Sequence, residues 1–570
     1  MTQPGLPAMV QLPARRAYGL LASPFLGPVL LVAVFFLARY LRLDSFGWYE
    51  DDLTILPQAV TLSPAALLAF VGEYIVGLQG HARPLSNTLI YLLGNFGWRL
   101  GGLAGQYAIG FLVEALNIVL FYELVRRVWG STLAMLAGFA YVLYAADTTQ
   151  VFLTHSLGAQ PSITLLLLAL DGYLSHRYVA AYALAFLILF SYETPFAVFL
   201  AAPLLQRADG RSTLGRLAVH AVVLGAMVAM GYLIRTWVGE ERVTGQPLLS
   251  LVQTSLTHVV AGPLVSLGTY AYRPLQVLSS GSWVVWAAVM LSLPCFFYIV
   301  QRLSREVESP RERPPANAAS LRNLWRPLIV GFLMLGAAYA LALTVRPYAI
   351  SGRDTRVHLA AVLGAALVVG TVANFGLHWA RRRRHWFAGP AILAALFALW
   401  FGYGFVIQED YAKAWDLQRS FWPQLLPQIE DAGPGTVVVI DPIGLTDTRQ
   451  IGANTWNLPR LLEQMYEIPS DWTTPPRVFR ALPEWRDFLI LPDGTLRIDG
   501  DTTQSPTAVH TTTDWDHLIV IHTGDGVARR TEPLVVDAVA YPLAAAGELR
   551  LGRLPRLLLY DLLIGSPSAP

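Results

Sequence analysis

The sequence predicts an α-helical membrane protein with about eleven spans, followed by a small α/β domain. The chain has 570 residues, of which 54% are hydrophobic and 14% charged, and its mean hydropathy is +0.46. Soluble globular proteins are typically about 25% charged, so this composition excludes an ordinary soluble enzyme, a disordered chain and a nucleic-acid binder. Residues 1–406 carry 28 basic and 17 acidic side chains, whereas residues 407–570 carry 13 and 22. This division predicts a membrane domain over 1–406 and an aqueous domain over 407–570.

Hydropathy and arginine placement together predict the order of the spans. A helix needs about 20 apolar residues to cross the hydrocarbon core, and basic residues collect at the cytoplasmic ends. The predicted spans are 20–42, 105–125, 130–146, 159–174, 178–192, 195–206, 214–238, 283–301, 327–345, 358–380 and 387–406. The strongly basic connections then share one side, which places the N-terminus in the cytoplasm and the C-terminal domain outside a plasma or inner membrane.

Two predicted outer loops are long. The first, 43–103, contains an amphipathic helix from Pro64 and a short apolar segment, 84–98, which could re-enter or cross the membrane. The second runs from about 239 to 282. In the C-terminal domain, residues 436–441, 487–491 and 517–522 have strand patterns and 458–466 has helical spacing, which predicts a small α/β unit.

Three consecutive acids, Glu50, Asp51 and Asp52, follow the first span. Adjacent carboxylates repel one another, which raises the pKa of at least one of them unless a cation compensates. This arrangement suits a general base or a metal ligand, and the alternative is a solvated loop at the membrane interface. Charge is scarce in the membrane domain, so we identify this triplet as the candidate catalytic site.

A possible anion site follows about thirty residues later, at His81, Arg83 and Pro84. A proline at the start of a helix leaves the helix N-terminus open to an anion, and the planar guanidinium of Arg83 matches a phosphate. The alternative is that Arg83 only anchors the helix at the interface.

Other polar residues are predicted on the same side of the membrane. His155 lies between the third and fourth spans, and Glu193 lies where the fifth and sixth spans meet. Arg353 and Arg356 open the tenth span three residues apart, so a helical turn would place both on one face, where they suit a diphosphate or phosphodiester. The structural alternatives are a hydrogen-bonding role for His155, a helix cap for Glu193 and interfacial anchoring for the arginines.

This pattern of motifs resembles the GT-C superfamily of polytopic membrane glycosyltransferases. The motifs are Glu50-Asp51-Asp52, Arg83-Pro84-Leu85, Tyr192-Glu193-Thr194 and Ser351 to Arg356. The resemblance covers residues 20–406 by topology and is nearest to the protein-mannosyltransferase-like and bacterial lipopolysaccharide-modifying branches.

The resemblance implies an enzyme that transfers a sugar from a polyprenyl-phosphate donor to a lipid, glycan or protein acceptor outside the membrane. It also implies that Asp51 or Asp52 is the base, and we favour Asp52 because it lies nearer the following apolar segment. Arg83, with Arg353 or Arg356, would hold the lipid phosphate, and the transfer would invert the anomeric carbon. The cofactor is left open, because a divalent metal is compatible with the acids but not required. A lipid-linked glycan ligase, a transporter or a non-enzymatic scaffold are the alternatives.

Overall fold

The computed structural model describes most of the chain. The described residues are 25–78, 82–206, 210–240, 246–306, 322–343, 345–383, 385, 387–440, 448, 451, 458–480, 488–491, 493, 495–499, 510–523, 527–536, 539–541, 543 and 550–565. His81 therefore lies outside the described residues, and so does the end of the predicted strand 436–441.

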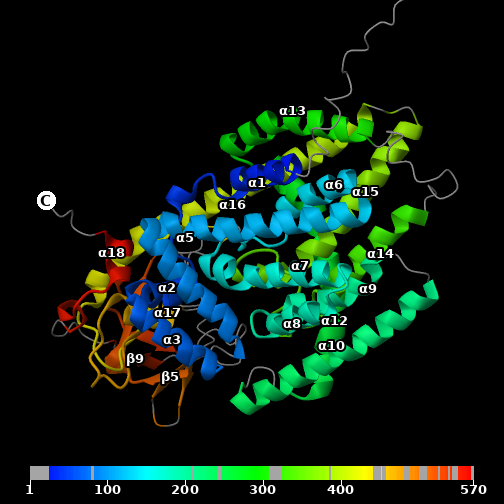
Figure 1. Cartoon of the computed structure of the whole chain (residues 1–570). Coiled ribbons are helices and arrows are strands. Elements are labelled where there is room, and N and C mark those ends of the chain that lie inside the picture. Colours follow the sequence, from blue (N-terminus) through cyan, green and yellow to red (C-terminus); the bar gives the residue numbers. More distant parts are fainter. Residues whose placement is uncertain are drawn as a thin grey trace, which may run out of the picture.

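The membrane domain is a layered bundle of helices, with the C-terminal sheets at one end of the molecule (Figure 1). Its α-helices are α1 (Leu26–Arg39), α2 (Asp52–Thr61), α3 (Pro64–Val76), α5 (Pro84–Trp129), α6 (Ser131–Val142), α7 (Gln160–Leu174), α8 (Tyr178–Leu189), α9 (Ala202–Leu205), α10 (Gly210–Val238), α12 (Leu248–Ser280), α13 (Trp283–Glu306), α14 (Arg322–Ala337), α15 (Ala361–Arg382) and α16 (Ala388–Leu425). Four short helices interrupt this series, namely the π-helix η3 (His155–Ala159) and the 3₁₀-helices η2 (Leu43–Ser45), η4 (Thr194–Ala201) and η6 (Arg353–His358).

The helices confirm a polytopic membrane protein. Eight helical stretches in the described residues are long and apolar enough to cross a membrane, and α6, α8, η4 with α9, and α14 are shorter apolar helices. Each of the eleven predicted spans overlaps one of these helices. The number eleven itself stays a prediction, because several of the helices are shorter than a full crossing.

The apolar segment 84–98 forms the first part of α5 and does not continue straight into the second span. The helix is broken at Gly101 and Gly102, and Gly102 has a φ of +59°, which glycine tolerates readily. Beyond the break the chain doubles back. As a result, the Gln106 side chain donates a 3.0 Å hydrogen bond to the Gly94 carbonyl. Asn95 bonds the Ala59 carbonyl at the end of α2. The segment therefore lies beside α2 instead of crossing alone.

The predicted loop 239–282 is largely a helix, α12. Pro263, Pro274 and several polar residues lower its hydropathy, which is why the sequence pattern favoured a loop. Ser255, near one end of α12, bonds the Ala340 carbonyl, and Arg273, near the other end, bonds the Ile350 carbonyl. Both carbonyls belong to the connection between α14 and η6, and α12 also packs against α15 and α16. Because α12 is one of the eight helical stretches long and apolar enough to cross a membrane, the prediction of an outer loop over these residues is wrong.

The bundle interior depends on close helix contacts through small residues. α15 packs against α6 and α14, and a Cβ atom on Gly370 of α15 would lie 2.5 Å from the Cα of Ala137 in α6. Small residues at such crossings let helix backbones approach closely, which is a main source of helix association in membranes.

The C-terminal region is a small α/β unit, as predicted. The strands are β1 (Val437–Ile440), β2 (Arg477–Arg480), β3 (Phe488–Ile490), β4 (Leu496–Asp499), β5 (His510–Thr513), β6 (Leu518–His522), β7 (Ala528–Arg529), β8 (Leu534–Val536) and β9 (Val539–Tyr541). One sheet has the order β2-β1-β6-β7, with β1 parallel to β2 and to β6, and β7 antiparallel. Strands β3-β4-β5 and β8-β9 form antiparallel sheets.

Helices α17 (Leu458–Met465) and α18 (Leu558–Ile564) attach this unit to the membrane domain. Both contact α2, the helix that follows the acidic triplet, and α18 also contacts α16. Helix α16 itself continues past the predicted domain boundary at 406 to Leu425. The C-terminal unit is thus packed on the same end of the bundle as the acids.

The close contact at Gly370 predicts that a larger residue on α15 destabilises the protein where the helix meets a neighbour and not where it faces open space. Gly370→Ala is expected to lower the free energy of unfolding by about 1–3 kcal/mol, because the new methyl group meets backbone atoms of α6. Gly376→Ala is the matched control, since nothing lies within 4 Å of that position on the same helix. The measurement is thermal unfolding of the purified variants, followed by tryptophan fluorescence. Equal melting temperatures for the two variants would contradict the proposed close contact at Gly370.

Candidate active site

The acidic triplet lies against the two arginines that open α15. The Asp51 carboxylate accepts hydrogen bonds from Nη2 of Arg353 at 2.9 and 3.0 Å and from Nη1 of Arg356 at 3.2 Å. The side chain of Asp51 is 24% exposed and those of the arginines are 13% and 20% exposed. Burial alone would raise the pKa of Asp51, but the two guanidiniums outweigh it and hold the pKa at about 2.

Helix η6 explains why both arginines reach the same carboxylate. Gly352 begins it with a φ of +72°, and residues three apart eclipse one another in a 3₁₀-helix. Thr355, between the arginines, bonds the hydroxyl of Thr148 at 2.9 Å, and buried His358 bonds the Ala349 carbonyl. These contacts fix η6 to the bundle. Because both arginines bond the Asp51 carboxylate, Arg353 and Arg356 lie on the same face, as the sequence predicts.

Asp52 has different surroundings from Asp51. It is 0% exposed, and its carboxylate accepts hydrogen bonds from the backbone N–H groups of Thr154 at 2.7 Å, Leu153 at 3.2 Å and Tyr49 at 3.3 Å. Burial raises the pKa of Asp52 to about 7, although these hydrogen bonds oppose the shift. Asp52 therefore joins the first residues of α2 to the loop that precedes η3.

Glu50 is also buried, at 2% exposure, and its backbone has a φ of +46°. Positive φ is unfavourable for a residue with a Cβ atom, and such strain is concentrated at functional sites. The carboxylate of Glu50 interacts electrostatically with Arg353. All three predicted acids thus belong to one cluster, but Asp51 accepts hydrogen bonds from both Arg353 and Arg356.

His155 lies beside this cluster, at the start of the π-helix η3. Its Nδ1 lies 3.1 Å from the Thr149 carbonyl, which can only accept, so we assign the proton to Nδ1 and a lone pair to Nε2. The Nε2 atom is buried and has no hydrogen-bond partner, and the ring interacts electrostatically with Asp51. A π-helical turn is frequent at functional sites, and this one begins at a histidine that interacts with Asp51.

A second cluster forms around Glu193. Its carboxylate accepts a 2.8 Å hydrogen bond from Nε of Arg83, a further one from Nη2 of Arg83, and a 3.1 Å hydrogen bond from Nη2 of Arg235. Burial would raise the pKa of Glu193, but Arg83 and Arg235 outweigh it and lower the pKa well below its usual value. Arg83 and Glu193 belong to separate motifs in the sequence, and the structure brings them together.

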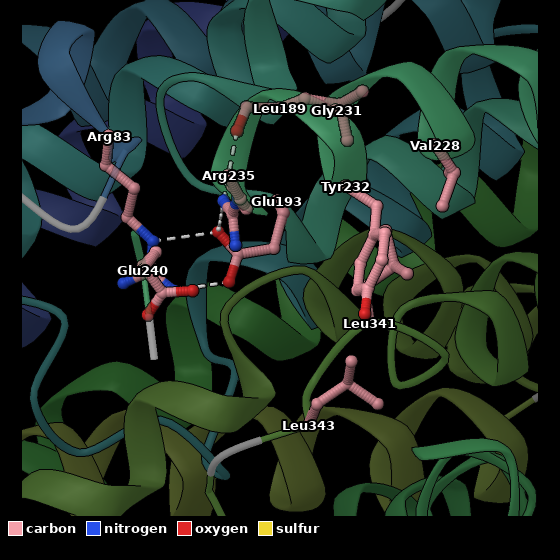
Figure 2. A pocket seen from close by; sticks show the side chains of 10 residues that line it. All are labelled: Arg83, Leu189, Glu193, Val228, Gly231, Tyr232, Arg235, Glu240, Leu341 and Leu343. Carbon is pink, nitrogen blue, oxygen red and sulfur yellow. Dashed lines mark hydrogen bonds and ion pairs between the residues drawn. The ribbon is translucent and has the colours of Figure 1, made fainter. Parts of the chain in front are cut away.

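The second cluster forms one end of a cavity of about 90 Å³ (Figure 2). The charged side chains of Arg83, Glu193, Arg235 and Glu240 gather on one side of the picture, and Val228, Tyr232, Leu341 and Leu343 lie on the other. The lining residues are Arg83, Leu189, Glu193, Val228, Gly231, Tyr232, Arg235, Glu240, Leu341 and Leu343. The cavity therefore offers a charged end and an apolar end to a ligand.

Tyr192 lies close to both clusters. The guanidinium of Arg83 is 5.0 Å from the centre of the Tyr192 ring, within the range of a cation–π interaction. The same tyrosine interacts electrostatically with Arg356 of the first cluster. Tyr192 therefore interacts with an arginine of each cluster. The first cluster contains Asp51, His155, Arg353 and Arg356, and the second contains Arg83, Glu193 and Arg235.

Sequence reasoning missed Arg235, Glu240 and the cavity. Arg235 occupies the last turn of α10 on the predicted outer side, where positive charge is unusual, and that signal was available in the sequence. Glu240 lies two residues beyond the end of this helix. Among the described residues, no group of three or more His, Cys, Asp or Glu side chains is arranged to hold a metal ion.

The fold and the site define a multi-span helical membrane protein with paired carboxylate–arginine clusters at one end of the bundle. No family model and no curated protein matches the chain. Similar solved structures include ArnT from Cupriavidus metallidurans in the apo state, with 16% identity over 87% of this chain and 93% of that chain and a TM-score of 0.33. ArnT from the same organism bound to undecaprenyl phosphate has 14% identity over 79% and 89% and a TM-score of 0.35.

The different surroundings of the acids predict different effects on stability. Asp52→Ala is expected to lower the free energy of unfolding by about 1–3 kcal/mol, because it leaves buried backbone N–H groups without an acceptor. Asp44→Ala removes an exposed acid from the same loop and should leave stability within about 0.5 kcal/mol of the parent. Equal melting temperatures for the two variants in differential scanning fluorimetry would show that the Asp52 contacts do not hold the loop.

Proposed function

We propose that the protein is an integral-membrane glycosyltransferase that moves a sugar from a polyprenyl-phosphate donor to an acceptor on the extracytoplasmic face. One observation carries this proposal: a solvent-accessible carboxylate, Asp51, is held by two arginines, and Tyr192 connects this cluster to a second arginine pair at the charged end of a partly apolar cavity. A lipid phosphate needs cations for its head and an apolar surface for its chain. A lipid, glycan or protein acceptor would then approach from the aqueous side.

The geometry favours Asp51 over Asp52 as the base. Both oxygens of Asp52 accept backbone hydrogen bonds, and the residue has no exposed surface. Asp51 is the acid that retains exposed side-chain surface while facing the arginines. A base must come within hydrogen-bonding distance of the proton it removes, so Asp51 takes this role and Asp52 positions the loop that carries it.

The proposed reaction is a single in-line displacement. The acceptor hydroxyl transfers its proton to Asp51 as its oxygen attacks the anomeric carbon, and the bond from that carbon to the phosphate oxygen breaks with its electron pair. The phosphate gains one negative charge, which Arg353 and Arg356 on one side and Arg83 and Arg235 on the other would stabilise. Attack opposite the leaving group inverts the anomeric carbon.

The central substitution is Asp51→Asn, which keeps the shape of the side chain and removes its basicity. We expect kcat to fall by about 10²–10⁴-fold, the usual contribution of a general base, while the protein elutes as a folded monodisperse species. The assay is transfer of a mass-tagged sugar from a panel of polyprenyl-phosphate sugars to a membrane extract. Asp44→Asn serves as the control for an acid that lies outside the cluster.

Full transfer by both Asp51→Asn and Asp52→Asn would refute the assignment of the base to this triplet. Absence of transfer by the parent from every donor, together with substrate flux in liposomes, would favour a transporter.

The pH dependence separates the two acids. With a pKa of about 2, Asp51 is ionised throughout the range from pH 5 to 8, so as the base it predicts no loss of kcat/KM on acidification within that range. Asp52, with a pKa of about 7, would become protonated below pH 7 and kcat/KM would fall about tenfold per pH unit. Initial rates at subsaturating donor concentration distinguish these outcomes. If kcat/KM of the parent fell with a midpoint near pH 7, and this midpoint were absent in Asp52→Asn, Asp52 would be the base.

A further inference from the structure

Each of the two clusters contains one carboxylate held between two arginines. Asp51 lies between Arg353 and Arg356, and Glu193 lies between Arg83 and Arg235. In both clusters one arginine is bidentate, through its Nε and one terminal nitrogen. The arrangement occurs twice on unrelated segments of the chain.

A guanidinium uses the same planar N–H fork for a carboxylate and for a phosphate. The Arg353 nitrogens that hold Asp51 are therefore the nitrogens that a phosphate oxygen would need. The side chains of Asp51 and both arginines retain some exposed surface, so a ligand can reach them. The buried Nε of Arg356 has no hydrogen-bond partner, which leaves a donor in the cluster that Asp51 does not use.

We propose that the donor phosphate displaces Asp51 from Arg353 and Arg356, so that binding of the donor releases the carboxylate that then acts as the base. The inference rests on the function proposed above and deepens it. Without donor, Asp51 neutralises and orients the arginines; with donor, the phosphate replaces it. The carboxylate then turns to the acceptor hydroxyl.

Both the binding of the donor phosphate and the release of the product phosphate have a physical reason in this exchange with Asp51. While Asp51 is paired, two cations stabilise its charged form, and it is a weak base with a pKa of about 2. Transfer of the arginines to the phosphate removes that stabilisation, so the basicity of Asp51 rises only when a donor is present. After transfer, the phosphate carries one more negative charge and would bind the arginines more tightly than the donor did. Competition from Asp51 then helps the product to leave.

The test measures affinity without turnover. The probe is a radiolabelled polyprenyl phosphate, and its Kd is measured on full-length protein in nanodiscs. Under the exchange, Asp51→Asn is expected to bind the probe about tenfold more tightly than the parent, because two partly exposed ion pairs no longer compete with it. Arg356→Gln is expected to bind it at least about tenfold more weakly.

Glu123→Gln is the matched control. Glu123 forms an ion pair with Arg126 near the opposite end of α5 from Arg83, so its removal changes the net charge by the same amount and should leave the Kd unchanged. An equal or weaker affinity in Asp51→Asn, with a folded protein that binds the probe, would overturn the exchange and leave the proposed transferase function standing. No binding by the parent protein would overturn both.

Discussion

The ion pairs that join Asp51 to Arg353 and Arg356 connect segments about 300 residues apart in the chain. They link the loop after α1 to the 3₁₀-helix before α15. Each of these segments also has its own hydrogen bonds to the rest of the bundle. Asp52 is tied to the loop before η3, and Thr355 is tied to the same loop through Thr148. Three chain segments are thereby fixed around one carboxylate. Because a buried charge is costly without a partner, the opposite charges on these segments require them to meet.

Much of the architecture was predictable because membranes impose simple rules. An apolar length and a bias in arginine placement predicted helices that overlap α1, α10, α13, α15 and α16, and strand patterns predicted β1, β3 and β6. The rules failed at residues 239–282, where a helix long and apolar enough to cross a membrane replaces a predicted outer loop. Prolines and polar residues interrupt the apolar pattern of α12, and no local pattern encodes its contacts with the α14–η6 connection.

The site was predictable in its members but less so in its pairings. Scarce charge on the predicted outer side singled out Asp51, Arg83, Glu193, Arg353 and Arg356, and all five belong to the two clusters. The pairing of Arg83 with Glu193 rests on the tertiary packing of α5 against the turn after α8, which spacing cannot reveal. The distinction between Asp51 and Asp52 has the same origin, since it depends on which carboxylate the loop 147–154 covers.

The central claim is that a donor phosphate binds where Asp51 now holds Arg353 and Arg356. Solid-state NMR can test it directly, by measuring the dipolar coupling between the phosphorus of bound polyprenyl phosphate and the guanidinium nitrogens of ¹⁵N-arginine-labelled protein. We predict a coupling typical of hydrogen-bonding distance that is markedly reduced in the Arg353→Gln/Arg356→Gln double variant. A coupling that is unchanged in the double variant, or absent from the parent with lipid bound, would contradict the claim.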